Sequence, residues 1–194
     1  GESKVKFIEF RSIHSTNVLD LSDAQIQEFK SLIHSNGIGL SAIGSPIGKI
    51  KADQPFEPHL KRFERAIHLC GVFGIKNIRI FSFYLPDNST WDQWRDEVFR
   101  RMGVLVDMAR KAGVMLFHEN EHGIYGDSPD RVHEILARFY GEHFAAAFDP
   151  ANYAFCGFDA WEGWLKARDF TKHFHAKDWV TGEKHGCLAG TGHG

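Results

Sequence analysis

Three residues of the types that hold divalent metals recur at regular intervals in this sequence. Glu119, Asp149 and His175 each follow a run of apolar residues, and about 30 residues, enough for one strand and one helix, separate each from the next. Two carboxylates and one imidazole suit Mn²⁺, Mg²⁺, Co²⁺ or Zn²⁺ and leave positions for water or substrate. The spacing predicts a metal site, although a turn at Asp149 or an ion pair at Glu119 would explain either residue alone.

The segment HFHAKDW (173–179) places further polar residues beside the third candidate ligand. Because side chains alternate between the two faces of a strand, His173, His175 and Lys177 share one face, and Phe174 and Ala176 share the other. We therefore expect Lys177 to contact a substrate oxygen or phosphate, and His173 to border the same cavity. The alternative for Lys177 is an amine exposed at the rim.

Four other residues are weaker candidates for substrate binding. His122 lies just beyond Glu119 and is either a proton shuttle or an exposed loop histidine. Asn152 can bond a hydroxyl group or cap a loop. Glu9 and Arg11 share a face of the first strand-like run, where they can pair with each other or contact a sugar.

Two apparent motifs lack the context that they require. HENEH (118–122) matches the zinc-protease pattern, but it follows a strand-like run and precedes a loop, whereas that pattern needs a helix. GSPIGK (44–49) resembles a phosphate-binding loop with one residue too few, and no Ser or Thr follows Lys49. Its glycines could still let backbone N–H groups approach an anion.

The elements that position these residues alternate between strand and helix. Strand-like runs are expected at 5–10, 38–43, 77–84, 114–120, 144–149 and 170–176. Helical patterns begin near Ser22, Pro58, Ser89 or Thr90, Ser128 and Asp159, several of them at capping residues. Because a closed (β/α)₈ barrel needs about 250 residues, six units predict a doubly wound sheet or a TIM barrel lacking about two units. Either α/β architecture gathers polar residues at the carboxyl ends of its strands.

Composition narrows the class of protein. The 194 residues carry a formal net charge of −2, and no basic run suggests binding to nucleic acid. Three separated cysteines indicate neither a disulfide framework nor a thiolate zinc site, which favours a reducing, cytoplasmic location. No apolar run is long enough to span a membrane, so no membrane partner is expected.

Four strings, NIRIFSFY, HENEHGIYGDSP, FDPAN and HFHAKD, resemble in sequence and order the xylose isomerase-like TIM-barrel superfamily, in its sugar phosphate isomerase/epimerase branch. The similarity covers nearly the whole chain. It implies a single TIM-barrel domain over residues 1–194, present as a fragment without its first and last units. It also implies that Glu119, Asp149 and His175 are metal ligands, whereas the family's fourth ligand, a glutamate, would lie beyond the final LAGTGHG.

The resemblance further implies a divalent-metal-dependent isomerase or epimerase that acts on a sugar or sugar phosphate through a metal-stabilised enediolate. Glu119 would be both ligand and base, and Lys177 would contact the substrate. Three alternatives stay open: a dehydratase of inositol-derived ketones, an endonuclease at abasic DNA sites, and a metal or sugar binder without turnover. The expected partner is a small sugar; nucleic acid is disfavoured, and a homo-oligomer is compatible with the sequence.

Overall fold

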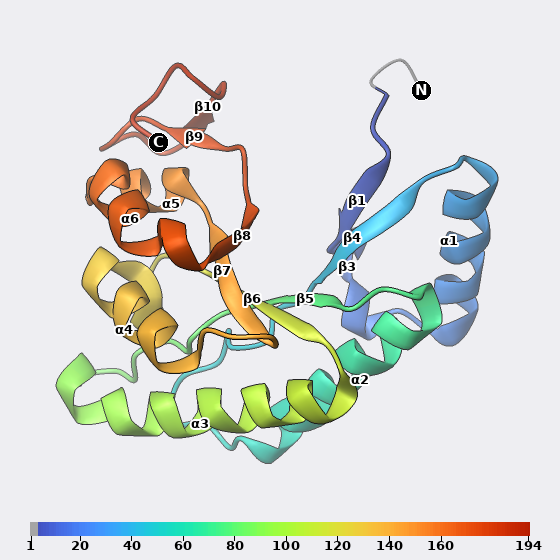
Figure 1. Ribbon diagram of the computed structural model, residues 1–194, viewed down its shortest axis with the longest axis horizontal. Coiled ribbons are helices and arrows are strands. Elements are labelled where there is room, and N and C mark those ends of the chain that lie inside the picture. Colours follow the sequence, from blue (N-terminus) through green and yellow to red (C-terminus); the bar gives the residue numbers. More distant parts are fainter. Residues whose placement is uncertain (1–3) are drawn as a thin grey trace.

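Six parallel strands form one sheet (Figure 1). In the computed structural model, which describes residues 4–194, they lie side by side in the order in which they occur in the chain. They are β1 (Phe7–Phe10), β4 (Gly39–Gly44), β5 (Asn77–Ile80), β6 (Met115–Glu119), β7 (Phe144–Phe148) and β8 (Thr171–Phe174). A doubly wound sheet would reverse its order at a switch point, and this sheet does not. The described residues therefore form part of a TIM-barrel wall, and the prediction of six strands alternating with helices is confirmed.

Five helices begin close to the predicted positions, four of them at predicted capping residues and one, near Pro58, without a side-chain cap. Ser22 and Gln25 form a capping box at the first of them, and Thr90 and Gln93 form another. Ser128 and Asp159 accept hydrogen bonds from the first turns of two more. The helices are α1 (Asp23–Ser35), α2 (Glu57–Phe73), α3 (Trp91–Ala112), α4 (Pro129–Phe139) and α6 (Ala160–Ala167).

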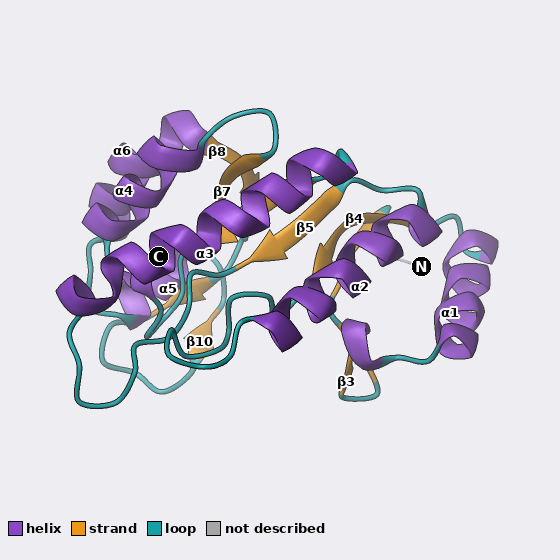
Figure 2. Ribbon diagram, turned by 90° about the horizontal axis from the view of Figure 1, so that it is seen from below, coloured by secondary structure: helices purple, strands orange, loops and turns teal. Residues whose placement is uncertain are grey.

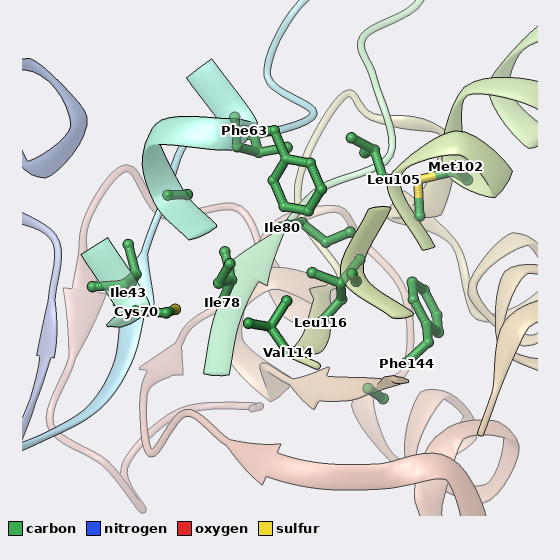
Figure 3. Packing of buried hydrophobic residues seen from close by; sticks show 14 of the residues in the cluster. Ile43, Phe63, Cys70, Ile78, Ile80, Met102, Leu105, Val114, Leu116 and Phe144 are labelled. Atoms are coloured by element: carbon green, nitrogen blue, oxygen red, sulfur yellow. The ribbon is translucent and has the colours of Figure 1, made fainter. Parts of the chain in front are cut away.

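The helices cover one face of the sheet, as Figure 2 shows for α2 and α3 over β5. Ile78 and Ile80 of β5 point into this layer, where they pack in one apolar cluster with Phe63 of α2 and Leu105 of α3 (Figure 3). The opposite face carries a smaller cluster, formed by Phe117, Ala145 and Ala147 with Met115. Alternation along β6 places Glu119, its last residue, on the same inner face as Phe117.

The loop after β4 is fixed against the residues that follow β5. Phe81 and Phe83 donate backbone hydrogen bonds to the carbonyls of Ile47 and Gly48 at 2.8 and 2.9 Å. Gly48 has a φ of +91°, and a Cβ atom there would lie 2.0 Å from the carbonyl oxygen of Phe81. The GSPIGK segment is thus a tightly packed extension of the sheet, and glycine is required at position 48.

Several short elements were not predicted. They are two hairpins, β2 (Ser12–Ile13) with β3 (Thr16–Asn17) and β9 (Asp178–Trp179) with β10 (Gly186–Cys187), three 3₁₀ turns at 18–20, 125–127 and 168–170, and the short helix α5 (Pro150–Phe155). β1 and β8 are the edges of the sheet, and there Phe7 and Phe174 are 63% and 53% exposed. Among residues 4–194, no helix is both long enough and apolar enough to cross a membrane.

Candidate metal centre

The three predicted ligands meet above the inner face of the sheet. Glu119 ends β6, Asp149 follows β7 and His175 follows β8, so each reaches the same edge of the parallel sheet. Nδ1 of His175 lies 3.1 Å from Oε1 of Glu119 and 3.6 Å from Oδ2 of Asp149. Single ligand atoms of the three residues all lie within 4.8 Å of one another. This donor set and spacing fit a divalent cation.

Asp149 is placed by two asparagines. Its backbone N–H donates to Oδ1 of Asn120, and the Nδ2 group of Asn120 donates back to the carbonyl of Asp149. Its Oδ1 atom accepts the backbone N–H of Asn152 at 3.0 Å and so caps α5. Oδ2 is left to face His175. The sequence DPAN therefore begins a helix, and that helix aims one carboxylate oxygen at the candidate centre.

Glu119 is buried and is paired with a buried arginine. Arg79 on β5 donates from Nη1 to Oε2 of Glu119 at 2.7 Å, while Nδ2 of Asn152 lies 3.3 Å from Oε1. Burial acts to raise the pKa of Glu119. The hydrogen bond from His175 and the charge of Arg79 outweigh it and hold that pKa well below its usual range. Glu119 is therefore a carboxylate, as a metal ligand must be.

His175 lies among carboxylates on both sides of its ring. Burial acts to lower its pKa, but hydrogen bonds with Asp149, Glu119 and Glu9 outweigh burial and raise the pKa to about 11. The cluster thus favours a positive charge at this position. A divalent cation on Nδ1 would supply that charge in place of the proton.

A second group of side chains adjoins the first. Oε2 of Glu9, on β1, lies 3.0 Å from Nε2 of His173 and 3.1 Å from Nε2 of His175. Oε1 of Glu9 lies 3.3 Å from Nε of Arg79. Burial acts to raise the pKa of Glu9, and the two histidines and Arg79 outweigh it and lower the pKa well below its usual range. Glu9 thus pairs with Arg79, not with the exposed Arg11.

The remaining predicted residues lie at increasing distance from this cluster. Nζ of Lys177 lies 2.7 Å from Oδ1 of Asn152 and 3.4 Å from Oδ2 of Asp149, so both residues border the centre. His122 is exposed in the loop after β6 and packs its ring against Phe155. Arg11 lies just beyond the end of β1. His118 and His122 do not share a helix, as expected for HENEH.

Two residues of the centre, Arg79 and Asn120, were not predicted from the sequence. Arg79 lies within the apolar run NIRIFSFY, where alternation places it on the face opposite to Ile78 and Ile80. A charged residue inside a central strand was a usable signal, because such a charge must be paired when it is buried. Asn120 gave no comparable signal, since it follows Glu119 at the start of a polar loop.

The chain is similar to one protein family and to several solved structures. The profile of the family described as "xylose isomerase-like TIM barrel" matches residues 2–193. A probable 3-DHS dehydratase, AsbF from Bacillus anthracis, has 16% identity and a TM-score of 0.67, with 81% of this chain and 57% of that one covered. A xylose isomerase-like TIM-barrel protein from Mycobacterium smegmatis, solved with magnesium, has 20% identity and a TM-score of 0.73, with 92% and 64% covered.

A third solved structure, a D-tagatose 3-epimerase-like protein, has 18% identity and a TM-score of 0.71, with 88% of this chain and 68% of that one covered. The chain thus spans between 57% and 68% of the length of these three proteins. No curated protein matches the sequence. At these identities the three structures share the fold with this chain.

Proposed function

This chain belongs to the xylose isomerase-like TIM-barrel family, and from that premise we propose that it is a divalent-metal-dependent isomerase or epimerase of a sugar or sugar phosphate. The observation that carries the proposal is the meeting of Glu119, Asp149 and Nδ1 of His175 at the ends of successive strands. The magnesium in the Mycobacterium smegmatis protein and the epimerase-like neighbour support it.

Glu119, Asp149 and His175 would hold the cation, whose donor set allows Mn²⁺, Mg²⁺, Co²⁺ or Zn²⁺. When bound, such an ion polarises oxygen atoms on neighbouring carbons of a substrate and so makes the adjacent C–H group more acidic. The chain's own residues then orient the sugar and move the proton.

In this proposal, Glu119 is the base that takes the proton next to the carbonyl. Its carboxylate is ionised and is held by Arg79, so it approaches the substrate from one fixed side. Lys177 would contact a substrate oxygen, because its amine is already held at the rim by Asn152. Asn152 would contact a hydroxyl group. Substrate contacts by Glu9, His122 and Arg11 stay predictions, as do the cytoplasmic location and a homo-oligomer.

A dehydratase is the second candidate, favoured by the fold shared with the probable 3-DHS dehydratase AsbF. Loss of a hydroxyl group needs the same removal of a proton next to a carbonyl, so the same residues would serve. An abasic-site endonuclease is less well supported, because the net charge of −2 offers little attraction for DNA. A binder without turnover is the remaining alternative.

The test is turnover by the purified chain with added Mn²⁺ on a panel of ketoses, their phosphates and inositol-derived ketones. We expect an isomeric sugar as product, and Glu119→Gln should abolish its formation. The matched control is Glu142→Gln, which makes the same chemical change at an exposed position before β7, at the opposite end of the sheet. An unsaturated ketone as product would favour the dehydratase over the isomerase. Undiminished turnover by Glu119→Gln would show that Glu119 is not the base.

A further inference from the structure

The two ring nitrogens of His175 face different carboxylates. Nδ1 points to Glu119 and Asp149, which form the candidate metal centre with it. Nε2 points to Oε2 of Glu9, 3.1 Å away. An imidazole that binds a metal through one nitrogen carries a hydrogen on the other, and in metal sites that N–H group is almost always donated to a carboxylate, a carbonyl or water. Glu9 lies where this acceptor is expected.

Glu9 is itself held in place from two sides. Arg79 lies 3.3 Å from its Oε1 atom, and His173 lies 3.0 Å from its Oε2 atom. The ring of His173 is stacked on Phe117, with centroids 5.0 Å apart and planes 14° from parallel. The carboxylate of Glu9 therefore has little freedom to turn away from His175. Its negative charge makes it a stronger acceptor than a carbonyl or a water molecule.

We propose that Glu9 is a positioning residue for the metal ligand His175. The carboxylate accepts the Nε2–H group, selects the tautomer whose free lone pair is on Nδ1, and orients that lone pair towards Glu119 and Asp149. His173 supports Glu9 and does not itself touch the metal. This inference rests on the metal centre of the proposed function, but it assigns to Glu9 a role other than substrate contact.

Loss of such a partner typically weakens metal binding about 10- to 100-fold. Glu9→Leu removes the acceptor, so we expect the Kd for Zn²⁺ to rise by this factor, with one equivalent still bound. Glu9→Gln returns a neutral acceptor and should recover part of the affinity. Glu142→Gln, the exposed control, should bind Zn²⁺ as the unchanged protein does. Circular dichroism checks that every variant is folded.

The measurement is calorimetric titration of the full chain with Zn²⁺, together with ¹⁵N NMR of its histidine rings in the Zn²⁺-loaded protein. In the unchanged protein, we expect the His175 ring to be a single tautomer with its hydrogen on Nε2. In Glu9→Leu, we expect this single tautomer to be lost. If Glu9→Leu does not fold, two measurements remain: the smaller rise of the Kd for Zn²⁺ in Glu9→Gln, and the tautomer of His175 in the unchanged protein.

Equal affinity in the unchanged protein and Glu9→Leu would overturn the inference and leave the proposed function intact. Two equivalents of Zn²⁺ in the unchanged protein, one of them lost in both Glu9→Leu and His173→Phe, would also overturn it, because Glu9 and His173 would then be ligands themselves. No binding of Zn²⁺ or Mn²⁺ by the unchanged protein would remove the metal centre, and with it both proposals.

Discussion

Arg79 and Glu119 form an ion pair beneath the candidate metal centre, with 2.7 Å between Nη1 and Oε2 and side chains only 8% and 6% exposed. Removing one partner of a buried pair leaves a charge without compensation, which typically costs about 3–5 kcal/mol. We expect Arg79→Leu to lower the free energy of unfolding by this order and to raise the pKa of Glu119. Urea denaturation and NMR titration of the carboxyl group would measure the two effects.

The control for that variant is Arg110→Gln, which breaks an exposed ion pair with Asp107 on α3. Such pairs contribute about 0–1 kcal/mol, so its stability should hardly change. Equal losses in the two variants would contradict a special role for the buried pair.

Under the proposed function, added Mn²⁺ or Zn²⁺ should stabilise the chain, because the ligands of the site would be brought together only in the folded protein. At a free concentration 100 times the Kd the gain is about 2.7 kcal/mol. Thermal denaturation with metal and with chelator measures it. His175→Ala should abolish the shift, whereas His122→Ala, in the exposed loop, should retain it. If His122→Ala alone lost the metal-induced shift in thermal stability, HENEH would have to be reconsidered as a metal-binding motif.

We expect the buried His59 to lower the free energy of unfolding as the pH falls. Burial, with smaller effects of Arg62 and Arg101, lowers its pKa to about 4, and its Nε2 accepts the backbone N–H of Gly48 at 2.8 Å. In the unfolded chain its pKa is about 6.5, so the unfolded state binds the proton first as the pH falls. Stability from this group is complete above about pH 6.5 and is lost towards pH 4.

The pH dependence can be assigned to His59 with one substitution. His59→Gln offers a neutral acceptor to Gly48 that does not titrate, so unfolding free energy measured from pH 7 to pH 4 should fall less steeply than in the unchanged protein. His118, which is fully buried and also has a pKa lowered to about 4, remains in both proteins. Parallel curves for the two proteins would show that His59 contributes nothing to the slope.

Two glycines should respond in opposite ways to alanine. Gly48→Ala forces a Cβ atom against the carbonyl of Phe81 at a φ of +91°, so we expect severe destabilisation. Gly71 lies in α2, where a new Cβ would meet no neighbouring atom within 4 Å. Gly71→Ala should therefore stabilise the chain by about 0.5–1 kcal/mol. Melting temperatures of both variants provide the comparison. A Gly48→Ala protein as stable as Gly71→Ala would show that the loop can move.

Asp178 holds the last residues of the chain against β9. Its carboxylate accepts backbone N–H groups from Trp179, Gly190, Gly192 and Gly194, and these bonds lower its pKa to about 2. Asp178→Asn removes the charge and one acceptor, so we expect residues 180–194 to exchange amide hydrogens faster and to be cut sooner by proteases. Glu183→Gln, which alters an exposed side chain of the same segment, is the control. Equal protection in the two variants would contradict the prediction.

Local patterns in the sequence were enough to predict the helices and strands of this sheet. Ser22, Thr90 and Ser128 begin helices because capping depends on residues within one turn. Alternation likewise predicted that His173, His175 and Lys177 share one face, and in the structure their side chains border the same cluster. It could not show which charged residue of another strand lies next to Glu9. The pairing of Glu9 with Arg79, and not with Arg11, depends on how β1, β4 and β5 lie side by side. Pairings between distant strands depend on the curvature of the whole sheet.

The strand order has a consequence for synthesis of the chain. Because each strand of the sheet joins the one made before it, the wall can grow as the polypeptide leaves the ribosome. Asp149 and His175 follow the last two strands of the described sheet, and His175 then contacts Glu9, 166 residues earlier in the chain. A nascent chain that stops before β8 lacks an imidazole for the cation. If the metal centre forms as proposed, uptake of the cation would mark chains in which β8 has already joined the sheet.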